Sequence, residues 1–304
     1  MKFDSNESLE QARQRNIEDA LREDIGTGDW TAMLVPAGRS TRAQVVVRED
    51  AVLCGRDWFD AVFAALQKDA RIEWLFAEGA EMPSGSTVCR IEAESRALLS
   101  AERPALNFLQ LLSGTATATR RHVRAIEGAS PNARGCAILD TRKTIPGLRQ
   151  AQKYAVRVGG GQNQRLALWH GILIKENHIA AAGGVPQVMQ QALALNAGVE
   201  IQIEVETLDQ LQQALDAGAT SVLLDNFPLP RVREAVAITA GRALVEVSGG
   251  VTLERLSEIA ATGVDRISIG GLTKDVRAVD FSMRVLDALI SARCAPAASA
   301  PSGS

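Results

Sequence analysis

Residues 140–179 read DTRKTIPGLRQAQKYAVRVGGGQNQRLALWHGILIKENHI, and this stretch links two apolar runs, one just before it at 136–139 and one inside it at 171–174. Seven of its residues are Lys or Arg and two are acidic, which gives a local net charge of +5 in a chain whose net charge is −3. A solvated basic face is the usual explanation of such a charge run. Here several of the charges come directly after apolar runs, where the ends of buried strands face a site. The stretch therefore predicts a cationic pocket for an anionic small molecule.

The apolar runs continue along the chain at a regular interval. Further β-branched runs occupy 199–205, 220–224, 243–247 and 264–269, and each run is followed by a segment long enough for a crossover helix. The residues that close the last five runs are Lys175, Glu204, Asp225, Ser248 and Gly270, at spacings of 29, 21, 23 and 22. Six parallel strands at such even spacing predict a β/α barrel with its site at the carboxyl ends of the strands. An open doubly wound sheet is the alternative.

The N-terminal part of the chain has a different pattern, which predicts a small α+β unit. The expected helices are 9–25, 57–67 and 96–114, and the expected strands are 43–48, 71–76 and 87–92. Pro104 lies inside the last helix, where it lacks an N–H group and crowds the preceding turn, so we expect a kink or a restart there. Arg103 would then stand at an irregular point of the helix.

Composition excludes several classes of protein. The chain has 304 residues, 46% of them hydrophobic, and a pI of about 5.8, so it supplies a large core and lacks the charge of a nucleic-acid binder. Its 4 cysteines include no Cys-x-x-Cys pair, which argues against a zinc site or a disulfide framework. No window approaches the roughly 18 apolar residues of a membrane span. We expect a cytoplasmic protein without a membrane or nucleic-acid partner.

Two glycine loops follow the last two predicted strands, as Ser248-Gly249-Gly250 and Ile269-Gly270-Gly271. Glycine lets the backbone approach a ligand closely, and a pair of such loops at the end of a barrel is a recurrent phosphate site. Ordinary strand-to-helix turns are the alternative. The Gly159–Gly161 run lacks the spacing of a dinucleotide fingerprint, so we expect a flexible lip there.

Two acidic residues, Glu204 and Asp225, end neighbouring strands. Two carboxylates with open coordination suit Mg²⁺ when substrate phosphates supply its other ligands. An ion pair with Lys175 or Lys143 is the alternative. Of the three histidines, only His178 is a candidate to enter the site, because it lies just past Lys175.

Several of these motifs together resemble one family. The segments ALNFLQLLSGTAT, DTRKTIPGLRQAQKYAV, GGGQNQR, GILIKENH, VEIQIEVE, LLDNF, EVSGGVT and DRISIGGLTKDV are similar to those of the quinolinate phosphoribosyltransferases, the carboxylating nicotinate-nucleotide pyrophosphorylases of NAD biosynthesis. The similarity extends from EDIGTGDWT near the N-terminus to about Asp280.

The resemblance implies a type II phosphoribosyltransferase fold, in which an N-terminal α/β sandwich domain precedes an incomplete six-stranded β/α barrel. On this chain the sandwich domain would span 1–116, joined by a C-terminal helix at 278–294, and the barrel would span 117–277. Residues 295–304 would form a disordered tail. The resemblance also implies a homodimer with shared active sites, with a higher oligomer as a further option.

The reaction that the resemblance implies converts quinolinate and phosphoribosyl pyrophosphate to nicotinate mononucleotide, CO2 and pyrophosphate, with Mg²⁺ and no organic cofactor. Catalytic roles are implied for Lys143, Lys175, Glu204 and Asp225, and Glu204 and Asp225 would also serve the metal. The implied substrate-binding residues are these four and Arg103, Thr141, Arg142, Gln164, Arg165, Ser248, Gly249, Gly250, Ile269, Gly270 and Gly271. Among them Arg103 would come from the partner subunit.

The chain departs from the family pattern at three positions. Gln164 stands where GGG-x-N-H-R has histidine, His170 stands where aspartate is usual, and Pro104 replaces a threonine after Arg103. A paralogous phosphoribosyltransferase acting on a related acid is therefore one alternative function. A Schiff-base aldolase using Lys175 is another, from a different class.

Overall fold

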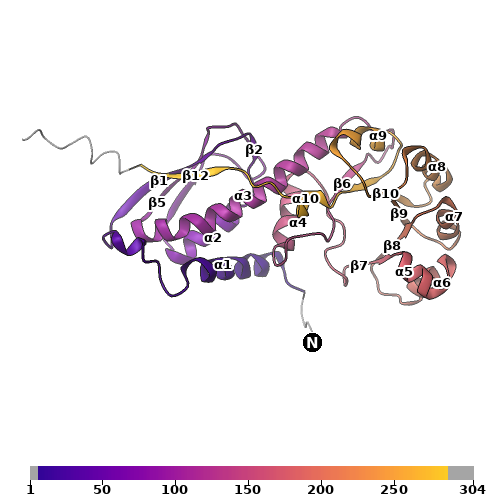
Figure 1. Ribbon diagram of the computed structural model, residues 1–304, viewed down its shortest axis with the longest axis horizontal. Helices are drawn as coiled ribbons and strands as arrows, with labels where there is room; N and C mark the ends of the chain where they lie inside the picture. The colour runs from indigo at the N-terminus through magenta and orange to yellow at the C-terminus, as the bar shows by residue number, and fades with distance from the viewer. Residues whose placement is uncertain (1–5, 287–304) are drawn as a thin grey trace, which may run out of the picture. The chain divides into compact units, whose positions relative to one another are not determined.

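The computed structural model describes residues 6–286, which form two compact units (Figure 1). The first unit comprises the described residues up to Gly114 together with those from Ala278 onward, and the second comprises Thr115–Arg277. Within the described range, no helix has both the length and the apolar character that crossing a membrane requires.

The first unit contains a four-stranded antiparallel sheet in the order β12-β1-β5-β3. The strands are β1 (Ser40–Val47), β3 (Arg71–Trp74), β5 (Thr87–Glu94) and β12 (Phe281–Val285), with a small second sheet of β2 (Ala51–Val52) and β4 (Glu81–Met82). Its helical segments are α1 (Leu9–Ile25), η1 (Ala32–Leu34), α2 (Arg56–Leu66) and the first part of α3 (Ser95–Ala125). Buried and exposed residues alternate along β5, so one face of the sheet contributes to a core that includes Trp58 and Phe59 of α2.

The helix α3 runs from Ser95 to Ala125 with Pro104 inside it. The predicted end at Gly114 is therefore wrong, and of the kink or restart expected at Pro104 the restart does not occur. Apolar residues continue at helical spacing on both sides of the proline, and Ala101, Ala105 and Leu109 are fully buried. The burial of this face stabilises the helix against the loss of one backbone hydrogen bond.

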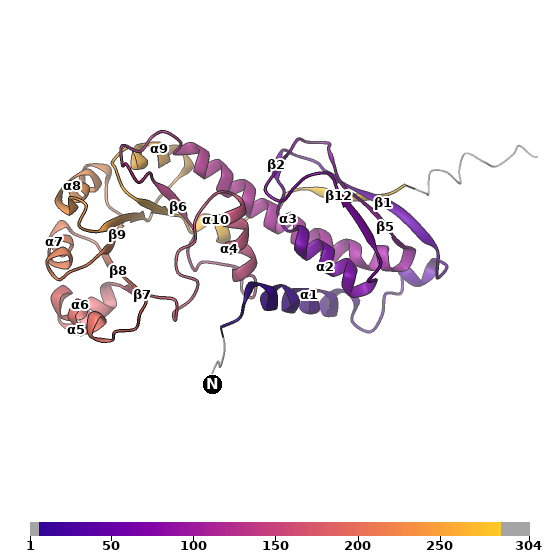
Figure 2. The ribbon, with the colours of Figure 1, turned by 180° about the vertical axis from the view of Figure 1, so that it is seen from behind.

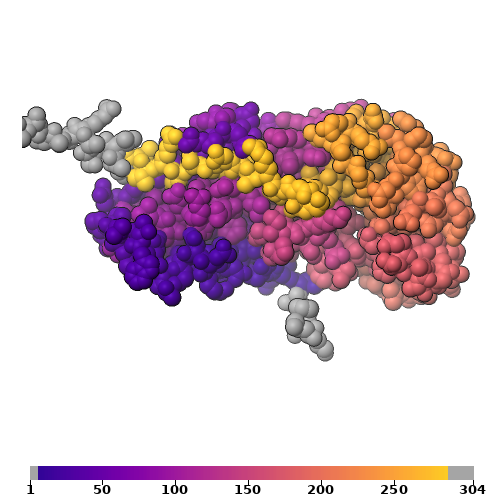
Figure 3. Space-filling view, in the orientation of Figure 1, coloured from indigo at the N-terminus to yellow at the C-terminus, as the bar shows by residue number. Residues whose placement is uncertain are grey.

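The described part of the predicted C-terminal helix is a strand. Residues Phe281–Val285 form β12, which pairs with β1 in antiparallel register from Val47↔Phe281 to Ala43↔Val285. In Figure 3 this yellow segment lies among the indigo and violet residues of the first unit. Pairing satisfies the backbone groups along the edge of β1, and this tertiary contact outweighs local helix propensity. The rest of the predicted helix, from 287, and the predicted tail at 295–304 lie outside the described residues.

The second unit is built on a six-stranded parallel sheet in the order β6-β11-β10-β9-β8-β7. The strands are β6 (Ala137–Leu139), β7 (Gly171–Ile174), β8 (Glu200–Val205), β9 (Ser221–Asp225), β10 (Leu244–Ser248) and β11 (Arg266–Ser268). From β7 to β11 each strand pairs with its successor, and β6 closes onto β11, so the order never reverses as it does in a doubly wound sheet. The unit is an incomplete six-stranded barrel, as predicted, and it is open between β6 and β7.

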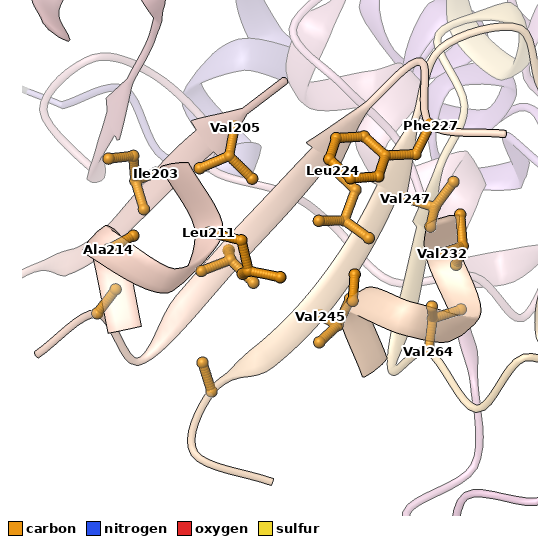
Figure 4. Close-up of a cluster of buried hydrophobic side chains, with 14 of the residues drawn as sticks. Ile203, Val205, Leu211, Ala214, Leu224, Phe227, Val232, Val245, Val247 and Val264 are labelled. Carbon is orange, nitrogen blue, oxygen red and sulfur yellow. The ribbon is translucent and has the colours of Figure 1, made fainter. Parts of the chain in front are cut away.

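Helices surround the outer side of this sheet (Figures 1 and 2). They are α4 (Arg149–Val158), α5 (Glu176–Ala182), α6 (Val185–Ala194), α7 (Leu208–Asp216), α8 (Leu229–Thr239), η2 (Leu253–Arg255), α9 (Leu256–Ala260) and α10 (Gly271–Lys274). Figure 4 shows part of the core between the layers, where strand residues such as Ile203 and Val245 lie near Leu211 of α7 and Val232 of α8. The outward side of each strand is thus apolar and covered.

Candidate active site

A cavity of about 640 Å³ lies in the second unit at the carboxyl ends of the strands. Ten of the predicted site residues line it: Thr141, Arg142, Lys143, Gln164, Arg165, Lys175, Glu204, Asp225, Ser248 and Gly249. Residues that the sequence prediction missed also line it, namely Leu173, Leu223, Asn226, Glu246 and Ser268. Residues that are up to 127 positions apart, from Thr141 to Ser268, are therefore gathered by the parallel strands into one place.

The period of two in a strand explains why these residues meet. Ile203 and Val205 of β8 belong to the covered core, so Glu204 between them points to the other side, into the cavity. The same alternation sends Glu246 and Ser248 of β10 inward while Val245 and Val247 pack outward. A signal for the missed residues was therefore present, because each lies two positions before a predicted strand end or next to one.

The remaining predicted residues do not line this cavity. Gly250, Ile269, Gly270 and Gly271 are absent from its lining, although Gly270 is close enough that a Cβ there would lie 3.0 Å from Cδ of Lys143. Arg103 lies on α3 in the first unit, and its side chain is exposed.

The two arginines in the cavity have little to neutralise them. Nε of Arg142 is buried without a hydrogen-bond partner, and no ion pair to Arg142 or Arg165 occurs within residues 6–286. Burial and the nearby charge of Arg142 lower the pKa of the Arg165 guanidinium. Such a shift means that the charged guanidinium is less stable here than in water, and a bound anion would offset this cost.

Unlike the arginines, Lys175, Glu204 and Asp225 have partners within the cavity. Nζ of Lys175 lies 2.8 Å from Oε2 and 3.2 Å from Oε1 of Glu204, so the ion pair weighed as an alternative from the sequence does form. The Lys175 side chain is 44% exposed and that of Glu204 11%. Asp225 accepts a hydrogen bond of 2.9 Å from the amide of Asn226. A Schiff-base lysine needs a free amine, whereas Lys175 here is engaged in an ion pair with Glu204.

A buried ion pair fixes the loop that carries Gln164 and Arg165. Lys153 of α4 and Asp140, at the end of β6, are bonded to each other with almost no solvent exposure. Lys153 Nζ also donates to the Gln164 carbonyl at 2.9 Å, and the Gln164 N–H donates to Asp140 Oδ1 at 3.0 Å. Burial raises the pKa of Asp140 and lowers that of Lys153, while each partner's charge opposes the shift. The pair therefore positions the loop and is not itself in the cavity lining.

Three amide and carboxyl side chains form a hydrogen-bonded chain across the barrel interior. The Arg165 N–H donates to Gln164 Oε1 at 2.6 Å, Gln164 Nε2 donates to Gln202 Oε1 at 2.8 Å, and Gln202 Nε2 donates to Glu246 Oε2 at 2.9 Å. Every donor points toward Glu246. Both the oxygen and the nitrogen of the Gln164 side-chain amide are thus hydrogen-bonded to protein groups, so Gln164 is not a free donor to a substrate.

The structure corrects two other predictions near the site. A Cβ on Gly159 would lie 2.6 Å from the Ala116 carbonyl oxygen and from Thr119 Cβ, so the predicted flexible lip is wrong and the glycines allow close contact with α3. His178 is exposed, and its Nδ1 accepts from the Lys175 N–H at 3.0 Å at the start of α5. It caps a helix and does not line the cavity.

The donor set of the cavity suits a hard cation only in part. Glu204 and Asp225 supply carboxylate oxygens, as Mg²⁺ requires, but within residues 6–286 no group of three or more His, Cys, Asp or Glu side chains is placed to hold a metal alone. A Mg²⁺ ion that takes one or two carboxylates and completes its shell with water and substrate phosphate fits this arrangement.

Fold and cavity together define an α/β-barrel enzyme whose site is cationic. Residues 29–113 match the N-terminal domain, and residues 115–284 the C-terminal domain, of quinolinate phosphoribosyl transferase. The chain belongs to the quinolinate phosphoribosyl transferase family.

Individual relatives agree with this assignment. The probable nicotinate-nucleotide pyrophosphorylase [carboxylating] of Bacillus subtilis is 40% identical over 264 residues, which cover 86% of this chain and 90% of that protein. The Mycobacterium leprae nicotinate-nucleotide pyrophosphorylase [carboxylating] is 40% identical over 281 residues, covering 90% and 96%. The solved structure of the Francisella tularensis nicotinate-nucleotide pyrophosphorylase superposes with a TM-score of 0.87 at 40% identity, covering 93% of this chain and 100% of that one.

Proposed function

We propose that this protein transfers the phosphoribosyl group of phosphoribosyl pyrophosphate to the ring nitrogen of quinolinate and releases CO2, which yields nicotinate mononucleotide and pyrophosphate for NAD biosynthesis. Family membership and the names of the relatives support the reaction. The observation that carries it on this chain is the uncompensated pair Arg142 and Arg165 in a cavity of about 640 Å³, since both substrates are polyanions.

Each part of the cavity has chemistry that suits one part of the substrates. Arg142 and Arg165 offer planar guanidinium groups for the two carboxylates of quinolinate. Lys143 and Lys175 offer point charges for the pyrophosphate. Ser248 and the backbone of Gly249 suit the 5′-phosphate, with the loop of Gly270 next to Lys143 as its neighbour, and the acids Glu204 and Asp225 suit the ribose hydroxyls.

The cations also serve the chemical step. Attack of the ring nitrogen on the anomeric carbon expels pyrophosphate, whose developing charge the lysines stabilise. Loss of CO2 from the position beside the now positive nitrogen leaves an ylide. Fixed cations around this ring lower the barrier because they stand in place before charge develops and need no reorganisation.

Mg²⁺ would neutralise pyrophosphate charge when bound, and Glu204 and Asp225 are the residues that would hold it. A cytoplasmic location is also part of the proposal, and cysteines without Cys-x-x-Cys spacing suit a reducing compartment.

A homodimer with shared sites completes the proposal, with Arg103 reaching the cavity of the partner subunit. The exposure of Arg103 on α3, far in sequence from the strand ends, supports this placement. Mixing Arg103→Ala protomers with Lys175→Ala protomers should regenerate sites that hold both residues. Mixed dimers without recovered activity would show that the site is not shared.

The deciding experiment supplies quinolinate labelled in its 2-carboxylate with phosphoribosyl pyrophosphate and Mg²⁺. Release of labelled CO2 in proportion to nicotinate mononucleotide is the expected result. Turnover of a related acid with quinolinate unreacted would establish a paralogous phosphoribosyltransferase instead.

A further inference from the structure

One acid in the cavity has no part in the roles above. Glu246 lies in the middle of β10 with its side chain directed into the cavity, and it is only 1% exposed. Its Oε2 accepts the hydrogen bond from Gln202, while its Oε1 is buried and has no hydrogen-bond partner. Burying a carboxyl oxygen without a hydrogen-bond partner costs free energy. Because this oxygen belongs to a residue that lines a ligand cavity, we expect its partner to be part of the ligand.

The other two acids that line the cavity have different environments. Glu204 is ion-paired with Lys175, and Asp225 is only partly buried and accepts from Asn226. Burial raises the pKa of the Glu246 carboxyl, and the hydrogen bond from Gln202 and the nearby hydroxyl of Ser268, which also lines the cavity, offset part of that rise. Of the three, Glu246 is therefore the one suited to carry a proton.

The charged groups around Glu246 do not cancel the rise in its pKa. Arg266 of β11 lowers its pKa and Glu200 of β8 raises it, and these two are paired with each other at 3.1 Å. The cavity contributes the cations Arg142, Lys143, Arg165 and Lys175 and the acids Glu204 and Asp225. Bound anionic substrates offset those cations, which further favours the neutral form of Glu246.

We propose that Glu246 is the acid that delivers the final proton to the pyridine ring. This inference rests on the proposed function. In the step, the bond between ring carbon 2 and its carboxylate breaks, CO2 leaves, and the electron pair stays on carbon 2 beside the positive nitrogen. The O–H bond of Glu246 then breaks and its proton forms the new C–H bond. Glu246 is left as a carboxylate and regains a proton from water.

A second cavity offers a route for that water. It encloses about 350 Å³ and is lined by Gln202 and Gln164, among others, so it reaches the side chain that holds Glu246 Oε2. Glu246 thus borders the substrate cavity and, through Gln202, lies one hydrogen bond away from a second cavity. A general acid must be recharged in each cycle, and this arrangement allows it.

The test uses Glu246→Gln, which keeps the size and hydrogen-bonding capacity of the side chain but has no proton to transfer. The unmodified protein must first release labelled CO2 from quinolinate, since failure there rejects the proposed function and not this inference. The kcat of the unmodified protein should fall as pH rises through the raised pKa of Glu246, because only the protonated carboxyl group can donate a proton to the ring. In the variant, kcat should drop by about a hundredfold or more, the usual contribution of a general acid, and this alkaline limb should vanish.

Substrate affinity and a second variant separate a catalytic role from a binding or structural one. The Kd of quinolinate for Glu246→Gln should stay within about threefold of the unmodified value. In Gln202→Leu, which removes the hydrogen bond that favours the charged form, the alkaline limb should move to higher pH.

Three results would overturn the assignment. One is a Glu246→Gln variant with normal kcat and normal affinity for quinolinate. Another is a Glu246→Gln variant that keeps its kcat but binds quinolinate more weakly, which would make Glu246 a carboxylate-binding group. The third needs no variant: an unmodified protein whose kcat shows no fall as pH rises.

Discussion

Lys153 and Asp140 form an ion pair in the interior of the barrel unit, with 2% and 0% of their side chains exposed. Lys153 also donates to the carbonyl of Gln164, and Asp140 accepts from its N–H. The position of Gln164 in the cavity therefore depends on this ion pair. Removing one charge would leave the other buried and unpaired.

Lys153→Met is therefore expected to destabilise the protein by about 3–5 kcal/mol. Chemical denaturation measures this, and Lys274→Met is a matched control because its pair with Asp275 is about half exposed and should contribute no more than about 1 kcal/mol. The double variant Asp140→Leu, Lys153→Met should recover much of the loss. Equal destabilisation by the two single lysine variants would show that the buried pair has no special role.

Glu204→Gln tests whether the acid at the end of β8 serves turnover more than folding. Its partner Lys175 is 44% exposed and can reach water, so we expect a change in unfolding free energy of about 1 kcal/mol or less. The rate should fall about tenfold for each 1.4 kcal/mol of lost transition-state stabilisation. The variant should also need more Mg²⁺ to reach half its maximal rate. A variant that unfolds yet keeps normal activity per folded molecule would support a purely structural ion pair.

The Ser248 loop offers a comparison of two adjacent glycines. Gly249 has φ +87°, and a Cβ there would overlap the side-chain amide of Asn226, whereas Gly250 has φ +58° and open space around it. Gly250→Ala should cost only the roughly 1–2 kcal/mol of a left-handed backbone. Gly249→Ala should in addition displace Asn226 at the cavity and raise the KM for phosphoribosyl pyrophosphate by tenfold or more. Equal KM values for the two variants would remove this loop from phosphate binding.

The barrel was predictable because its signals are local. Each predicted strand is an apolar run, closed by a polar residue in every case except the last, and 171–174 matches the observed β7 at both ends. The strand-end residues follow from the same pattern, since parallel strands bring their carboxyl ends together. Gln202 and Glu246 lie in the middle of strands. They were not predicted as site residues because the apolar run around each one was treated as a strand without examining its polar members. Counting back two positions from each strand end identifies them.

Other features depend on contacts that the sequence does not state. The segment after Ala278 has helical periodicity, yet it completes a sheet edge offered by β1, more than 200 residues earlier in the chain. Similarly, Gly159 and Gly161 look like a flexible run until Ala116 and Thr119 are seen against them. In both cases a distant partner decides the conformation.

The last prediction concerns Gln164, where the family pattern has histidine. Gln164 accepts from the Arg165 N–H and donates to Gln202 Oε1, and a neutral imidazole can do the same with one ring nitrogen as acceptor and the other as donor. A protonated imidazole loses the acceptor and stands beside the cations Arg142 and Arg165. Both effects lower the pKa of a histidine at this position, so Gln164→His should titrate somewhat below the ordinary value of about 6.5.

The affinity for quinolinate should report this titration. At acid pH the added positive charge should tighten binding by Gln164→His relative to the unmodified protein, and the ratio of the two Kd values should approach one as pH rises through roughly 6 to 6.5. Gln164→Leu is the control, because it loses the same hydrogen bonds without a charge and should bind more weakly by a constant factor at every pH. His170→Asn and His178→Asn, made in the Gln164→His background, should leave the titration in place. If the unmodified protein already shows the same fall in affinity, Gln164 does not account for the difference and the 163–165 loop must bind quinolinate through its arginine alone.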